Sequence, residues 1–158
     1  MQKKVADIFF QALKFQKAAY LLNRNLEDDN WALLVPYITN ISFTIELYLK
    51  ALLTSEGKKG KVIEIHKLKE LFGLLSEISQ KRINYLFSQQ INNSKSPAFN
   101  DDNSLEAVLE DISNAFVKSR YFYESNLGGV RFLNEVLVSV QLTLLEKEPD
   151  LQKYIKAD

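Results

Sequence analysis

The stretch from Trp31 to Leu53 constrains the fold of this chain more than any other part of the sequence. It reads WALLVPYITNISFTIELYLKALL and contains only two formal charges, Glu46 and Lys50. A segment this long and this apolar is typical of a helix that other helices cover on most sides. We therefore predict a central bundle helix over about residues 31–55. Asn40 and the two charges would make crossing a membrane costly, which favours the bundle.

The two charges within this helix, Glu46 and Lys50, are four residues apart and therefore share one helical face. A carboxylate and an ammonium group in so apolar a segment form either a structural ion pair or part of a site. The sequence leaves both interpretations open.

Apolar residues recur at helical spacing along the rest of the chain, and helix breakers are scarce, with 5 Gly and 3 Pro among 158 residues. No segment reads as a convincing strand. The first and last of the further helices are predicted over about residues 3–25 and 130–146. A third helix starts near His66 and ends at a break at Ser79–Gln80, and a short fourth helix follows this break. A fifth helix begins at an Asn103–Glu106 capping box. We expect one all-α domain over residues 1–158, an up-and-down bundle of about five main helices.

Composition excludes several classes of function. The chain has 20 basic and 20 acidic residues, which argues against a nucleic-acid binder that works by bulk electrostatics. It has no Cys and a single His, so neither a thiolate nor a His-rich metal site is expected, and we predict no metal and no cofactor. The N-terminal residues lack the unbroken apolar core of a signal peptide, and we expect a cytoplasmic protein without a membrane partner.

A polar and aromatic cluster, Arg120-Tyr121-Phe122-Tyr123-Glu124, interrupts the helical pattern after the fifth predicted helix. A guanidinium group can hold a phosphate through two parallel hydrogen bonds, and tyrosine rings can stack on a base. The same aromatic side chains can instead belong to the core with their hydroxyls in water. The polar segment of residues 91–104 is long for a bundle loop, and such loops are usually functional or disordered.

His66 stands at the start of the third predicted helix and can act as an acid or a base near neutral pH. It can equally be a structural residue that caps or packs this helix. If the bundle brings the second, third and fifth helices together, His66 and Arg120 share one cleft with Glu46, Lys50 and Glu124, which orient or support them.

Three segments occur in an order that resembles a known family: NISFTIELYLKALL followed by a Gly-Lys turn, then IHKLKELFGLL, then FVKSRYFYE. Together they are similar to the HEPN superfamily, the helical-bundle domains of prokaryotic toxin, defence and nucleotidyltransferase-associated systems. The resemblance covers roughly residues 5–145. It implies a homodimer, a polar cleft near Arg120, and a partner such as RNA, a nucleotide, an antitoxin or a nucleotidyltransferase.

Many HEPN proteins are metal-independent ribonucleases with an Arg-x4–6-His motif near the final helix. Arg120 fits the arginine position, but no histidine follows it, position 124 is Glu, and His66 lies far upstream. The motif is therefore incomplete, and the resemblance by itself carries no activity over to this chain.

Three functions stay open. The first is a non-catalytic or accessory module that binds a nucleotide, RNA or a partner protein through a cleft around Arg120, with Lys50, Tyr121 and Tyr123 in support. The second is a metal-independent endoribonuclease, of toxin or defence type, in which His66 and Arg120 are catalytic. The third is a purely structural interaction bundle whose polar cluster is a buried joint.

Overall fold

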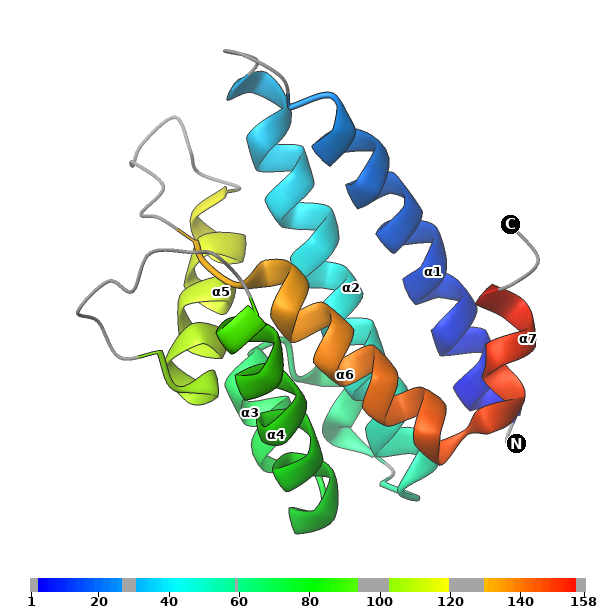
Figure 1. Cartoon of the computed structure of the whole chain (residues 1–158). Helices are drawn as coiled ribbons and strands as arrows, with labels where there is room; N and C mark the ends of the chain where they lie inside the picture. Colours follow the sequence, from blue (N-terminus) through cyan, green and yellow to red (C-terminus); the bar gives the residue numbers. More distant parts are fainter. Residues whose placement is uncertain (1–2, 27–30, 59, 94–102, 120–129, 156–158) are drawn as a thin grey trace.

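The computed structural model describes residues 3–26, 31–58, 60–93, 103–119 and 130–155, and these residues form an all-helical bundle without strands (Figure 1). The predicted all-α fold is confirmed. The described part holds seven α-helices rather than about five: α1 (Lys3–Arg24), α2 (Leu34–Ser55), α3 (Leu68–Gly73), α4 (Glu77–Asn93), α5 (Leu105–Ser119), α6 (Leu133–Lys147) and α7 (Gln152–Ile155).

Helix α2 is the centre of the bundle, and it contacts α1, α3, α5 and α6. Figure 1 shows α1 running beside α2 as a long hairpin; α3, α5 and α6 pack against α2, and α4 packs against α6. Ile41, Ile45, Leu49 and Leu52 of α2 are fully buried, as expected for a helix covered on most sides. Each such side chain stabilises the fold by about 1.5–3 kcal/mol relative to exposure. None of the helices in the described ranges has the length and apolar character that a membrane span requires.

A polar network lies inside the contact of α1, α2 and α6. The hydroxyl of the fully buried Tyr48 donates to Oε1 of Gln16, at 2.5 Å. The Nε2 of Gln141 donates to both of these oxygens, at 3.0 and 3.1 Å. Because each buried polar atom of this network has a partner, the network fixes the packing of the three helices at little net cost.

A second polar joint connects the C-terminal end of α2 to α4 and α6. The Glu56 side chain is only 4% exposed and accepts hydrogen bonds from the hydroxyls of Ser76 and Ser79, both at 2.6 Å, and from the Ser76 backbone N–H at 2.8 Å. Lys147 of α6 lies 3.2 Å from the same carboxylate. Since Ser76 directly precedes α4, the carboxylate also faces the positive end of that helix.

The break between the third and fourth helices lies earlier in the sequence than the predicted Ser79–Gln80. The Ser76 hydroxyl accepts the backbone N–H of Ser79 at 3.4 Å, which caps the start of α4. Ser79 is therefore inside α4, where its hydroxyl serves Glu56 rather than ending a helix. Ile78, in the first turn of α4, is exposed.

The starts of α5 and α6 also differ from the prediction. The hydroxyl of Ser104 accepts the N–H of Ala107 at 3.3 Å, so Ser104 caps α5 and the predicted Asn103–Glu106 capping box is wrong. Helix α6 begins at Leu133 because Phe132 adopts the left-handed conformation, with φ of 58°. The predicted loop over residues 91–104 begins later, since α4 continues to Asn93, and residues 94–102 lie outside the described part.

Candidate functional site

The two charges of α2 form a buried ion pair. The Nζ of Lys50 lies 2.7 Å from Oε1 of Glu46, and the side chains are only 11% and 3% exposed. The four-residue spacing on a helix sets this geometry, and the surrounding apolar residues keep water away from the carboxylate. The predicted proximity of Glu46 and Lys50 on one face is therefore found.

His66 comes to this pair from a different part of the chain. Its Nδ1 lies 3.0 Å from the same Oε1 of Glu46, while its side chain is 67% exposed. The residues on either side of it, Ile65 and Lys67, are extended, so His66 lies in a short connector between the 3-10 turn Lys61–Glu64 and α3. The connector is held at its end, because the Leu68 N–H donates to the Ser113 hydroxyl of α5 at 3.0 Å.

This arrangement orients the imidazole of His66. A carboxylate accepts hydrogen bonds, so Nδ1 carries the proton that it donates to Glu46, and the second ring nitrogen, Nε2, is left to accept. Among the described residues, Nε2 of His66 has no hydrogen-bond partner. A buried carboxylate that fixes an exposed imidazole in one tautomer suits ligand binding as well as proton transfer.

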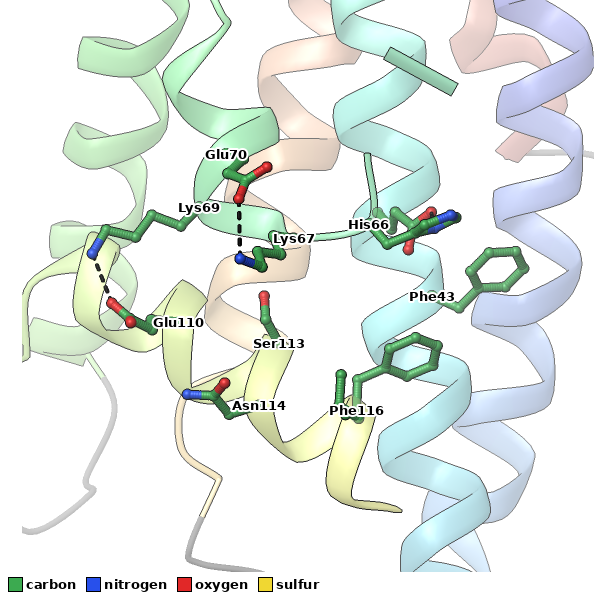
Figure 2. Close-up of a pocket in the computed structure, with 11 residues that line it drawn as sticks. Phe43, His66, Lys67, Lys69, Glu70, Glu110, Ser113, Asn114 and Phe116 are labelled. Carbon is green, nitrogen blue, oxygen red and sulfur yellow. Dashed lines mark hydrogen bonds and ion pairs between the residues drawn. The ribbon is translucent and has the colours of Figure 1, made fainter. Parts of the chain in front are cut away.

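A cavity of about 510 Å³ opens beside His66, within the size range of small-molecule sites. We call it the His66 cavity, and Figure 2 shows how its lining comes from α2, α5 and the start of α3. Phe43 of α2 and Phe116 of α5 supply aromatic surface near His66, and Ser113 and Asn114 supply polar groups from α5.

The His66 cavity carries charges of both signs, and most of them are paired. Lys67 lies 3.3 Å from Glu70, and Lys69 lies 2.7 Å from Glu110 (Figure 2). The hydrogen bond from Lys69 holds the pKa of Glu110 below its ordinary value, and the same contact raises the pKa of Lys69. Because the lysines are matched by carboxylates, this cavity is not strongly electropositive.

The structure brings Glu46, Lys50 and His66 together, although 20 residues separate the carboxylate from the imidazole in sequence. The other four predicted site residues, Arg120, Tyr121, Tyr123 and Glu124, lie outside the described residues.

Comparisons with models of known protein families, with curated proteins and with solved structures give no match. The resemblance to the HEPN superfamily therefore stays a prediction. Within the described ranges, no group of three or more His, Cys, Asp or Glu residues is placed to hold a metal ion.

Sequence reasoning missed the aromatic wall of the His66 cavity. Phe43 lies three residues before Glu46, on the flank of α2 that carries the charges, and this spacing was a usable signal. Phe116 gave no such signal, because its place in an apolar stripe of α5 is that of an ordinary core residue.

Proposed function

We propose that this chain is a binding module for a nucleotide or a short stretch of single-stranded RNA, and that the ligand occupies the His66 cavity. The observation that carries the proposal is the exposed imidazole of His66, which the buried Glu46 fixes at the edge of a cavity with aromatic walls. Proteins recognise single nucleobases by hydrogen bonds to the base edge and by stacking on aromatic side chains, and the cavity offers both kinds of group.

The aromatic surface gives the proposal its ligand class. Phe43 and Phe116 line the cavity from two different helices, and we propose that a flat ligand stacks on this aromatic surface. Stacking of a base on an aromatic side chain contributes about 1–3 kcal/mol and tolerates any base. Asn114 adds an exposed amide that can donate to and accept from a base edge.

The zero net charge of the chain is consistent with a small local site rather than a long nucleic-acid track. Val117 lines the His66 cavity, and Arg120 follows it by three residues in the sequence. We propose that Arg120 assists by contacting a phosphate of the RNA, with Tyr121 and Tyr123 in support.

We expect Phe116→Ala to weaken binding of a fluorescein-labelled, randomised eight-nucleotide RNA by about tenfold, because one stacked base loses its aromatic partner. His66→Ala is expected to weaken RNA binding by a similar factor, because the ligand loses its hydrogen bond to Nε2 of His66. Fluorescence anisotropy measures the dissociation constants, and circular dichroism confirms that each variant is folded.

Tyr85→Ala is the matched control for these variants. Tyr85 is an exposed aromatic residue on α4 that does not line the His66 cavity. Its removal should leave RNA binding unchanged. No binding by the wild type to either RNA or ribonucleoside monophosphates would refute the proposed function, as would equal weakening by Tyr85→Ala and Phe116→Ala.

A second function, metal-independent RNA cleavage, is favoured by the contact between Glu46 and His66. With Nδ1 bonded to the carboxylate, Nε2 is placed to accept the proton of a ribose 2′-hydroxyl as that oxygen attacks the adjacent phosphorus. The bond from phosphorus to the 5′-oxygen then breaks, and the departing 5′-oxygen takes up a proton from water. If this function holds, RNA incubated with the wild type in EDTA yields 2′,3′-cyclic phosphate ends. His66→Ala then lowers the rate by about 10²-fold or more, since general-base catalysis supplies about that factor. Intact RNA after incubation with the wild type would exclude it.

A further inference from the structure

A second cavity, of about 380 Å³, adjoins the His66 cavity and shares Phe43, Glu46 and His66 with it. The rest of its lining comes from the start of α1, the C-terminal half of α2 and the turn that follows α2. Three lysines, Lys4, Lys50 and Lys58, belong to this lining, and we call the space the lysine cavity.

The charges of the two cavities differ. Among the described residues, Glu46 is the only carboxylate that lines the lysine cavity, and it already accepts hydrogen bonds from Lys50 and His66. Within the described part of the chain, the ammonium groups of Lys4 and Lys58 form no ion pair. The lysine cavity is therefore electropositive, whereas the lysines of the His66 cavity are balanced by carboxylates.

The turn that carries Lys58 is fixed by the backbone rather than loosely attached. The Gly57 N–H donates to the Thr54 carbonyl, and the Lys58 N–H donates to the Leu53 carbonyl, both at 3.0 Å. Gly57 has a φ of 76°, so this pair of bonds is the Schellman motif that ends α2. Gly57 and Lys58, the first two residues of the basic turn, are thus anchored where Lys58 lines the cavity.

The walls of the lysine cavity strengthen its attraction for an anion. Ile8, Leu47 and Val62 line it and are partly buried, so one side of a bound anion would face an apolar wall, while the side chains of Lys4 and Lys58 are themselves exposed. In a region of lower dielectric constant, the interaction of an ammonium group with an anion is stronger than on an open surface.

We propose that the lysine cavity is an anion subsite that binds a phosphate group, with the ammonium groups of Lys4 and Lys58 as its ligand contacts. One ligand can then extend across the shared edge formed by Glu46 and His66, with its base in the His66 cavity and its phosphate in the lysine cavity. Only this joining of the two cavities rests on the proposed function.

The anion subsite is tested first by titration with inorganic phosphate at constant ionic strength. Nuclear magnetic resonance spectra of the ¹⁵N-labelled protein report the binding. We expect phosphate to shift the backbone amide signals of Lys58, Gly60 and Val62. The double variant Lys4→Gln/Lys58→Gln should weaken phosphate binding by about tenfold, because two charge-assisted contacts lose their charge. The control Lys81→Gln removes an exposed lysine of α4 that pairs with Glu77, and it should change nothing.

Calorimetry with adenosine and adenosine 5′-monophosphate then tests the connection of the two cavities. The wild type should bind the monophosphate more tightly than adenosine by about tenfold, and the double variant should lose this preference while its affinity for adenosine stays the same.

The outcomes separate the anion subsite from the proposed function. Phosphate affinity that is equal in the wild type and the double variant overturns the subsite, even where adenosine binds. Phosphate binding without any binding of adenosine, its monophosphate or RNA supports the subsite and refutes the nucleotide function. Absence of binding by all of these probes refutes both.

Discussion

Replacement of Glu46 by alanine is expected to lower the free energy of unfolding by about 3–5 kcal/mol, because the variant leaves the ammonium group of Lys50 buried without its carboxylate. The Lys50 side chain is only 11% exposed, and its Nζ lies 2.7 Å from Glu46. Urea denaturation followed by circular dichroism measures the change. A decrease of less than about 1 kcal/mol would contradict the burial of this pair.

A double variant distinguishes the cost of removing the carboxylate alone from the contribution of the whole ion pair. Glu46→Leu/Lys50→Met replaces both charges by apolar groups and should recover most of the stability that Glu46→Ala loses. Glu110→Ala is the matched control: Glu110 also pairs with a lysine, but on an exposed surface, where removal of the carboxylate should matter little.

The same double variant separates a binding site from a purely structural joint. It is expected to fold while lacking the carboxylate that orients His66. If the ion pair of Glu46 and Lys50 served packing alone, the double variant would still bind nucleotides as the wild type does. We expect binding of adenosine 5′-monophosphate to fall by about tenfold, because the imidazole is no longer fixed in one tautomer.

The sequence was sufficient for the central helix and its ion pair. The apolar character of residues 31–53 specified a helix buried on most sides, and the spacing of Glu46 and Lys50 specified their contact, since both features are local. Helix starts were less accurate, because Ser104 and Phe132 fix them through a single cap and a single left-handed residue.

The contact of His66 with Glu46 could not be derived in the same way. It depends on how the turn after α2 returns the chain to that helix and on the anchor between Leu68 and Ser113. Neither of these tertiary features has a periodic signal in the sequence. From the sequence we could predict only that Glu46 and His66 would form a site if the fold brought them together.

The Glu56 joint gave no signal at all, because a glutamate at the end of a helix, before a Gly-Lys turn, is ordinarily solvated. The structure instead buries this carboxylate under three hydrogen bonds from Ser76 and Ser79. Its importance follows from the groups that depend on it, which are Ser76 directly before α4, Ser79 within α4 and Lys147 of α6.

We expect Glu56→Gln to lower the free energy of unfolding at pH 7 by about 2–3 kcal/mol, because an amide replaces a buried charged acceptor that serves several donors. Chemical denaturation provides the measurement. Glu77→Gln is the control, since Glu77 is 79% exposed and, within the described ranges, pairs with Lys81 across one helical turn. An equal loss of stability in both variants would contradict the role of Glu56 as a joint between helices.

The effect of Glu56 should also depend on pH in a defined direction. Burial alone would raise its pKa, but the hydrogen bonds from Ser76 and Ser79 outweigh burial and hold the pKa below the ordinary value of 4.5. The folded state therefore takes up this proton less readily than the unfolded chain, and the stabilisation is complete above about pH 4.5 and is lost as the pH falls through the lowered pKa. The difference in stability between the wild type and Glu56→Gln should accordingly be constant from pH 8 to about pH 5 and shrink at lower pH. A difference that grows on acidification would show that the carboxylate is protonated more readily in the folded state, contrary to its hydrogen bonding.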